Sequence, residues 1–265
     1  MLDGVVYREA GTVRYAAIGD SFTEGLGDEL PDGLSRGWAD LVAAGLAAAR
    51  GETVQYANLA IRGRLLGPIV DEQLDAALAL DPPPTMITLN GGGNDMMRPG
   101  VDESKLVELT ERAVRRCVDA GVRLVLLSGA DPSERLPFGR VVHRRGVALT
   151  AAVAELAARY ELTFVDAFND VEIRRAAYWS PDRLHLNSLG HQRVASLVLS
   201  ALGHTTEARA LDPEQPTRRG LLAEARYYGE HVLPWLTRRL RGRSSGDDRA
   251  GKHAHWTPVE ALPRV

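Results

Sequence analysis

A serine near the amino terminus, Ser21, is a candidate nucleophile. It follows residues 13–18, an apolar run typical of a short buried strand, in the sequence Gly19-Asp20-Ser21. Ligands in open α/β sheets bind at the carboxyl ends of the strands, which is where this run would place the hydroxyl. Asp and Ser are also ordinary helix-capping residues, so a catalytic role for Ser21 depends on partners farther along the chain.

Three further segments carry residues that such a nucleophile needs. Gly63 and Asn94 each follow a predicted strand, and a glycine N–H or an asparagine amide can donate hydrogen bonds to a ligand. Asp182 and His185 stand three residues apart, so the carboxylate can accept the imidazole Nδ1–H and orient Nε2. Each residue, taken alone, also has an ordinary interpretation as a turn, a helix cap or a surface histidine.

Together these residues supply the parts of an acyl-transfer site. A serine hydroxyl is a weak nucleophile until a base such as His185 removes its proton. Negative charge that develops on the substrate oxygen needs fixed donors, for which the Ser21 and Gly63 N–H groups and the Asn94 amide are candidates. The pattern therefore predicts hydrolysis of a carboxylic ester through a covalent acyl-enzyme.

The order of these blocks resembles that of the SGNH hydrolases, also called GDSL-type lipases and esterases. The resemblance covers residues 13 to about 203 and rests on four blocks: Gly19-Asp20-Ser21, the glycine of Asn58-Leu59-Ala60-Ile61-Arg62-Gly63, Gly92-Gly93-Asn94-Asp95 and Asp182-Arg183-Leu184-His185. Three positions depart from the family pattern without removing a reacting atom. Phe22 stands in place of a leucine, Arg62 in place of a serine and Leu186 in place of a proline.

The resemblance implies a role for each candidate residue. Ser21 would be the nucleophile, His185 the base and Asp182 the residue that orients it. Gly63 and Asn94 would be the oxyanion donors. The resemblance also implies a flavodoxin-like sheet of five parallel strands, with no metal and no other cofactor.

The elements that must position these residues alternate between strand and helix. The predicted strands cover residues 13–18, 53–59, 86–90, 122–127 and 162–165, and the predicted helices cover residues 38–50, 69–80, 103–120, 141–160 and 187–202. Alternation with short connections predicts an α/β fold, a three-layer sandwich in which helices cover both faces of a parallel sheet.

The chain is expected to divide into three parts. Residues 1–204 form the SGNH hydrolase domain, and residues 205–241 form a linker and a basic amphipathic helix. That helix could dock on the domain or on a partner, mediate self-association, or lie on an anionic membrane surface. Residues 242–265 are polar and unpatterned, which predicts a disordered tail.

Composition narrows the range of partners and compartments. The chain has 265 residues, of which 45% are hydrophobic and 25% charged, with a formal net charge of −3. A nearly neutral chain has no overall field to attract nucleic acid. The only cysteine, Cys117, lies in a helical pattern and is expected to be buried. No signal peptide and no run of about 20 apolar residues is recognisable, so the expected compartment is the cytoplasm.

Three other histidines lack a partner carboxylate at the spacing of Asp182 and His185. His143, His191 and His204 have no carboxylate three residues before them, and His191 is expected to have a structural role on the last core helix. No cluster of ligand residues predicts a metal site.

The predicted function is that of a serine esterase or lipase acting on a small-molecule ester. A carbohydrate deacetylase or a thioesterase could use the same residues, and a catalytically silent flavodoxin-like binding module is the alternative from another class. Substrate contacts are expected from Phe22, Met96, Phe138 and Trp179, and other walls from Leu26, Met97, Leu136 and Tyr178. Most of these side chains are apolar, which favours an acyl chain.

Overall fold

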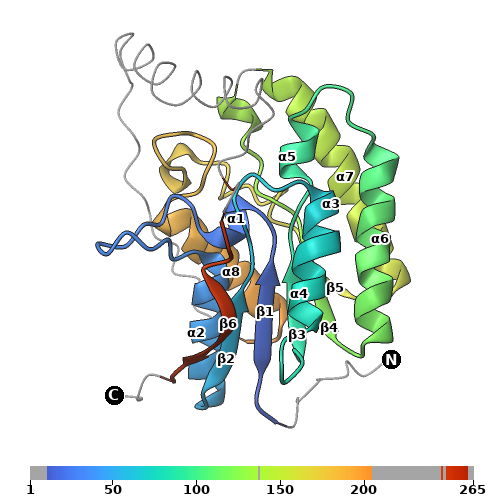
Figure 1. Ribbon diagram of the computed structural model, residues 1–265. Helices are drawn as coiled ribbons and strands as arrows, with labels where there is room; N and C mark the ends of the chain where they lie inside the picture. Colours follow the sequence, from blue (N-terminus) through green and yellow to red (C-terminus); the bar gives the residue numbers. More distant parts are fainter. Residues whose placement is uncertain (1–10, 137, 205–245, 247–248, 262–265) are drawn as a thin grey trace, which may run out of the picture.

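The structure is a computed structural model, and it describes residues 11–136, 138–204, 246 and 249–261. Its strands form one six-stranded sheet in the order β5-β4-β3-β1-β2-β6 (Figure 1). The strands are β1 (Arg14–Ile18), β2 (Val54–Asn58), β3 (Met86–Leu89), β4 (Arg123–Leu127), β5 (Thr163–Val165) and β6 (His253–Val259). Strands β1 to β5 pair in parallel, as the sequence predicts, and β6 pairs antiparallel to β2.

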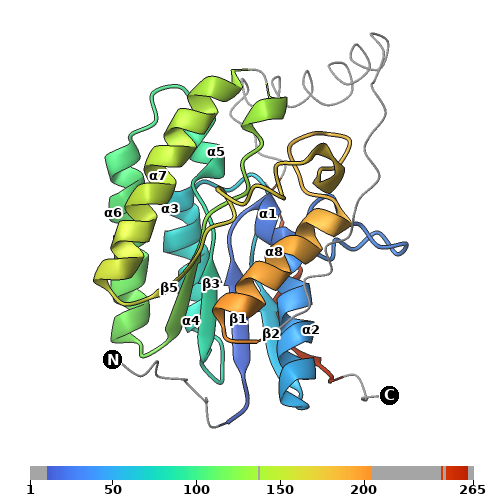
Figure 2. The same ribbon diagram turned by 180° about the vertical axis from the view of Figure 1, so that it is seen from behind.

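Helices cover both faces of the sheet, and the two views of the ribbon show the resulting three layers (Figures 1 and 2). The α-helices are α1 (Ser21–Glu24), α2 (Trp38–Arg50), α3 (Leu66–Pro68), α4 (Leu74–Leu78), α5 (Gly93–Met96), α6 (Glu103–Asp119), α7 (Gly139–Arg159) and α8 (Ser188–Ala201). Helices α2 and α8 lie on one face, and α3, α4, α6 and α7 lie on the other. The predicted α/β sandwich is confirmed.

Strand β1 shows why the sheet has two cores. Successive side chains of a strand point to opposite faces, so Tyr15 and Ala17 pack with α2 and α8, while Ala16 and Ile18 pack with the helices of the other face. All four side chains are fully buried, which explains the continuous apolar run in the sequence. The strand is thereby fixed in position up to the residue that precedes the candidate nucleophile.

The predicted element boundaries agree with the structure to within about three residues. One helix differs in form: the run predicted as residues 69–80 begins at α3, continues through a π-helical turn over Ile69–Gln73 and ends with α4. Gln73 of that turn is buried, and its side-chain amide bonds to both the N–H and the carbonyl of Gly19, at 2.8 and 2.9 Å. The widened turn thus supports the loop that follows β1.

The prediction of a disordered tail for residues 242–265 is wrong for β6. Strand β6 adds to the outer edge of β2, pairing Val54 with Val259 and Tyr56 with Thr257. The physical reason is that an edge strand presents unpaired N–H and C=O groups, which a polar segment can satisfy without a strong apolar pattern of its own. Hydrophobic periodicity therefore gives no signal for it.

Two other expectations concern membranes and the cysteine. Within the parts of the chain that the structure describes, no helix is both long and apolar enough to cross a bilayer. The predicted amphipathic helix of residues 205–241 lies outside the described residues. Cys117, on α6, is buried in the core, as predicted, and burial raises the pKa of its thiol to about 12.

Candidate active site

The candidate nucleophile begins a single turn of helix at the carboxyl end of β1. Gly19 makes the turn because space is tight there: a Cβ would lie 2.5 Å from Thr23 Oγ1 and 2.8 Å from the Asn90 carbonyl oxygen. Asp20 caps α1, since its Oδ1 accepts a hydrogen bond from the Phe22 N–H at 3.1 Å. The capping and the catalytic interpretations of this block are therefore compatible, and Ser21 is the first residue of the turn.

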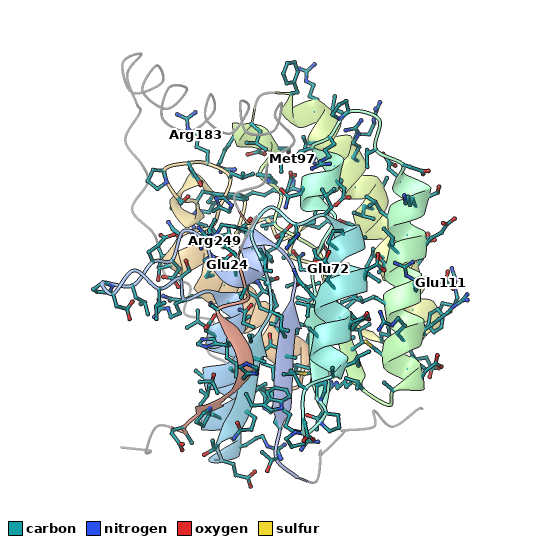
Figure 3. The ribbon with its side chains drawn as sticks, in the orientation of Figure 1. Glu24, Glu72, Met97, Glu111, Arg183 and Arg249 are labelled. Atoms are coloured by element: carbon teal, nitrogen blue, oxygen red, sulfur yellow. The ribbon has the colours of Figure 1, made fainter. Side chains whose placement is uncertain are left out.

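The candidate base is held by a tight loop before α8. Arg183 has a left-handed backbone conformation, with φ of 62°, and it folds His185 back toward Asp182. The Asp182 Oδ1 atom accepts the backbone N–H groups of Leu184 and His185, each at 3.0 Å. Arg183 and Met97 lie on the side of the molecule where the parallel strands end (Figure 3).

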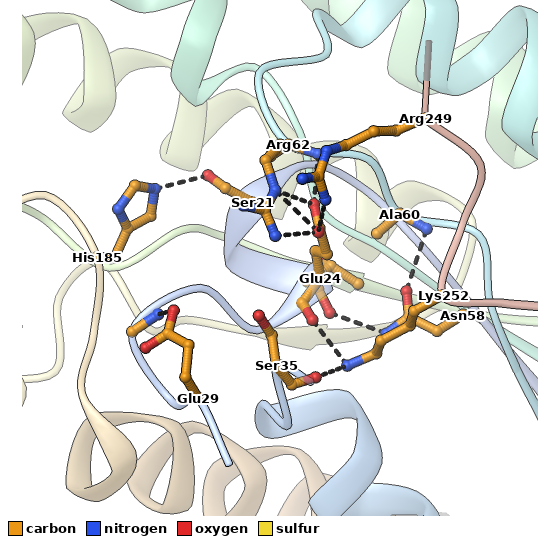
Figure 4. Close-up of polar contacts among 12 residues, drawn as sticks. Ser21, Glu24, Glu29, Ser35, Asn58, Ala60, Arg62, His185, Arg249 and Lys252 are labelled. Atoms are coloured by element: carbon orange, nitrogen blue, oxygen red, sulfur yellow. Dashed lines mark hydrogen bonds and ion pairs between the residues drawn. The ribbon is translucent and has the colours of Figure 1, made fainter. Parts of the chain in front are cut away.

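The two loops bring three side chains into one hydrogen-bonded chain. His185 Nε2 lies 3.0 Å from Ser21 Oγ (Figure 4), and His185 Nδ1 lies 2.6 Å from Asp182 Oδ2. Burial disfavours the ionised form of Asp182, but its hydrogen bond with His185, the histidine's charge and the Ser180 hydroxyl outweigh burial. The pKa of Asp182 is thereby held well below its usual range, so the carboxylate is ionised at neutral pH.

Of the two predicted oxyanion donors, only Asn94 lines the pocket that holds Ser21. Asn94, on α5, lines the same pocket as Ser21 and His185, and its Nδ2 donates to Asp20 Oδ2 and to the Arg64 carbonyl, each at 3.1 Å. Gly63 has a left-handed φ of 76° in the loop after β2, and it does not line that pocket. The oxyanion role of both residues stays a prediction.

A largely apolar pocket opens beside the serine. It lies between the carboxyl ends of the central strands, α7 and the loop that carries His185. Its apolar walls are Phe22, Met96, Met97, Leu127, Ala130, Pro132, Val142, Leu149, Val153, Phe168, Trp179, Leu184 and Leu186. Phe22, Met96, Met97 and Trp179 were predicted there.

Four predicted pocket residues lie elsewhere: Leu26, Leu136, Phe138 and Tyr178. Phe138, predicted as a substrate contact, does not line this pocket and is 87% exposed, and its contact with substrate stays a prediction. Phe138 adopts a left-handed φ of 60° just before α7, and the chain direction there turns its ring to solvent. The prediction relied on the position of Phe138 in the loop after β4, and that position does not reveal its backbone conformation.

A comparison with known protein families assigns the chain to one of them. A model of the GDSL-like Lipase/Acylhydrolase family matches residues 17–193, which include Ser21, Asn94, Asp182 and His185. The chain belongs to the GDSL-like Lipase/Acylhydrolase family. The resemblance found in the sequence is thereby confirmed. No match was found among curated protein sequences.

Solved structures share the fold of this acylhydrolase at low sequence identity. The lipase Lip_vut3 from a goat rumen metagenome is 19% identical with a TM-score of 0.61, covering 72% of this chain and 97% of its own. TesA is 22% identical with a TM-score of 0.59, covering 71% and 97%. The acetylxylan esterase Axe2 from Geobacillus stearothermophilus is 21% identical with a TM-score of 0.57, covering 74% and 96%. At these identities the likeness shows the three-layer fold alone.

The acylhydrolase has a second Asp–His pair that sequence spacing does not reveal. His143 Nδ1 lies 2.7 Å from Asp131 Oδ2, although twelve residues separate them. The His143 ring stacks on Phe168 at 5.7 Å. Neither member of the pair lines the pocket that holds Ser21, which distinguishes it from the Asp182–His185 pair.

His191 has the structural role that the sequence predicts. Its ring is fully buried, Nδ1 accepts the Trp38 N–H at 3.2 Å, and Nε2 donates to the Leu26 carbonyl at 3.0 Å. The ring therefore joins α8 to α2 and to the loop after α1. Burial is the main reason why the pKa of His191 falls to about 4.

This burial predicts a pH-dependent stability. Between about pH 6.5 and pH 4 the unfolded state binds a proton at His191 that the folded state does not, so the His191 contribution to stability falls as pH falls. The shift corresponds to a contribution on the order of 3 kcal/mol. Asp20 acts in the opposite sense, because burial raises its pKa to about 6. Urea unfolding of wild type and His191→Gln at pH 7 and pH 4 isolates His191, since both proteins keep Asp20.

The stability advantage of wild type over H191Q should be largest at pH 7 and should shrink by on the order of 3 kcal/mol at pH 4. An advantage that is equal at both pH values would contradict a buried neutral His191.

Sequence reasoning missed the wall that α7 contributes to the pocket. Val142, Leu149 and Val153 line it, yet in the sequence they belong to a helix whose apolar residues also form the core. The amphipathic pattern shows that these residues face inward, and it does not show that the inward face reaches a pocket. It also missed the polar contacts behind α1, which join Glu24 to Arg62 and to the segment that precedes β6.

Proposed function

We propose that this acylhydrolase cleaves carboxylic esters through an acyl-enzyme on Ser21. The observation that carries the proposal is the continuous hydrogen-bonded chain from Ser21 Oγ through His185 to an ionised Asp182, beside an apolar pocket. Each member has the partner that nucleophilic catalysis requires.

In the proposed mechanism, Ser21 Oγ attacks the ester carbonyl carbon while His185 Nε2 takes the hydroxyl proton. Asp182 accepts the Nδ1–H and stabilises the imidazolium that forms. The tetrahedral intermediate collapses when the C–O bond to the alcohol breaks, and His185 returns the proton to the departing oxygen. Water then attacks the acyl-enzyme, again losing a proton to His185, and the carboxylic acid leaves with Ser21 restored.

The apolar walls support an acyl chain as the group that occupies the pocket. Each buried methylene contributes about 0.8 kcal/mol, so every added methylene should raise kcat/KM by up to about fourfold until the pocket is full. A hydrated sugar would gain little from such walls. A carbohydrate deacetylase would place only an acetyl group there, and a thioesterase would differ only in the leaving group.

The testing experiment combines a covalent probe with a substrate panel. The full chain is treated with a fluorophosphonate probe, and the labelled peptide is identified by mass spectrometry. Nitrophenyl acetate, butyrate and octanoate, an acyl thioester and acetylated xylan are then compared. Labelling at Ser21 with a preference for longer nitrophenyl esters is expected. A folded protein that stays unlabelled would instead be a catalytically silent binding module.

A substitution on α7 tests the acyl pocket. Val153 lines the pocket and is half-buried, so Val153→Phe adds bulk that can extend into it. We expect kcat/KM for the octanoate to fall about 10-fold while that for the acetate changes less than threefold. Val147→Phe on the same helix is the matched control, since Val147 is 46% exposed and lies outside the pocket. Equal losses on both esters would count against an acyl chain in this pocket.

A further inference from the structure

A lysine from the carboxyl-terminal part of the chain lies directly behind the nucleophile turn. The Lys252 ammonium group donates to the Glu24 carbonyl at 2.7 Å, to the Ser35 carbonyl at 2.7 Å and to Asp40 Oδ2 at 2.6 Å. Its side chain is only 13% exposed. Figure 4 shows Lys252 meeting Glu24 and Ser35 on the far side of α1 from His185.

The first of these contacts acts on the helix that carries Ser21. Helix α1 has four residues, so it has little stability of its own, and its carbonyl groups lack partners within a longer helix. The Ser21 carbonyl accepts the Gly25 and Leu26 N–H groups, each at 3.1 Å. The Glu24 carbonyl, at the other end of α1, is bonded by Lys252, and a cation at a helix carboxyl end is favourable.

Strand β6 delivers the lysine to this position. The pairing of β6 with β2 shifts register between Tyr56 and Asn58, and beyond the shift the chain passes close to the loop after β2. A Cβ at Gly251 would lie 2.5 Å from Leu59 Cα, so only glycine allows the approach. Lys252 is the next residue after Gly251. The segment lies outside residues 17–193, which the family model matches.

The residue type fits the three acceptors. Lys105 and Lys252 are the only lysines among 32 lysine and arginine residues. An ammonium group is a compact point charge with three donors, and here three acceptors converge on it from three segments. A guanidinium group is a wide planar fork, and it cannot place three donors on acceptors that converge on one atom.

A second contact ties the same turn to the loop that follows β2. The Glu24 carboxylate is buried, accepts the Arg62 N–H at 2.7 Å and pairs with the Arg62 guanidinium. Arg249 approaches the same carboxylate at 4.0 Å, and the two side chains lie together in Figure 3. Glu24 is thus held through its carboxylate by Arg62 and through its carbonyl by Lys252.

We propose that Lys252 is a positioning residue for Ser21, holding α1 so that the hydroxyl stays within reach of His185. The proposal rests on the proposed function, since it concerns the rate at which Ser21 reacts. Lys252 touches neither the pocket nor the triad, so it acts through the Glu24 carbonyl. Loss of Lys252 should therefore lower kcat with little change in KM.

The test compares Lys252→Met with wild type. The methionine keeps most of the apolar stem and removes the ammonium group. We expect kcat for nitrophenyl butyrate and the fluorophosphonate labelling rate of Ser21 to fall about 10- to 100-fold, with KM within threefold, well below the melting temperature. If wild type is labelled and K252M reacts at the same rate, the proposal is wrong. If wild type itself is not labelled, the proposed function is wrong instead.

Two control variants separate positioning from loss of stability. Lys105→Met removes the other lysine, which is exposed on α6, and should leave kcat unchanged. Thr53→Ala removes the bond from Thr53 Oγ1 to Glu260 Oε2 beside β6 and should lower stability without lowering kcat. A loss of kcat in T53A equal to that in K252M would show that docking of β6, rather than Lys252, is responsible.

A chemical rescue keeps the test decisive if K252M does not fold. Lys252→Cys, purified as the folded protein, is alkylated with bromoethylamine, which rebuilds a lysine analogue at position 252. The buried Cys117, with a pKa of about 12, is not expected to react. Aminoethylation should restore kcat at least fivefold, whereas the neutral adduct from iodoacetamide should not. Equal kcat values for both adducts would overturn the proposal.

Discussion

Replacing Ser21 by alanine is expected to lower kcat for nitrophenyl butyrate by about 10⁶-fold, to a level that standard assays do not detect. The alanine lacks the oxygen that His185 Nε2 approaches at 3.0 Å, so neither attack on the ester nor an acyl-enzyme is possible. The melting temperature should change little, because the Ser21 backbone bonds that close α1 remain. Steady-state kinetics and thermal unfolding of the purified variant measure both effects.

Ser128 provides the matched control for this experiment. It also lines the pocket, but its hydroxyl accepts the Phe168 N–H at 2.9 Å and lies 3.3 Å from Asp166 Oδ1. Ser128→Ala should therefore still be labelled by the fluorophosphonate probe, whereas S21A should not. Labelling that survives in S21A and disappears in S128A would show that Ser128, rather than Ser21, is the nucleophile.

The triad could be predicted from sequence because its geometry is mostly local. Asp182 and His185 need only one tight turn to meet, and Ser21 needs only the end of a buried strand to reach the sheet edge. The remaining step, the meeting of the two loops, follows from the parallel order of the strands. Continuous apolar runs such as residues 13–18 indicate strands that are buried on both faces, as in a parallel sheet, so the convergence of the loops at one edge could be expected from the sequence.

The contacts that sequence reasoning missed depend on long-range packing. Asp131 and His143 meet across a loop and the first turns of α7, at a spacing that no motif describes. Lys252 reaches Glu24 because a polar strand fills the open edge of β2, and edge pairing uses backbone groups that every residue carries. Phe138 lies outside the pocket for a local reason: its own left-handed backbone conformation, which the sequence does not reveal, leaves it exposed.

Replacing Asp182 by asparagine is expected to lower kcat by about 10⁴-fold, the second largest effect we anticipate. The carboxylate accepts the His185 Nδ1–H and thereby leaves Nε2 unprotonated toward Ser21. An amide NH₂ facing Nδ1 would favour the other tautomer, in which Nε2 carries the proton and cannot accept one from the serine. Steady-state kinetics at neutral pH measure the loss, and circular dichroism checks that the variant is folded. The asparagine Oδ1 can still accept the Leu184 and His185 N–H groups.

The second Asp–His pair, Asp131 and His143, provides a matched control for D182N. Asp131→Asn alters the same kind of pair, at 2.7 Å from His143, without touching Ser21, so its kcat should stay within about threefold of wild type.

The combination S21A/D182N tests whether Ser21 and Asp182 act as one unit. Once Ser21 is gone, Asp182 has no proton transfer to support, so the double variant should be no slower than S21A. A further 10⁴-fold loss in the double variant would mean that Asp182 acts independently of the serine, and the acyl-enzyme mechanism would have to be abandoned.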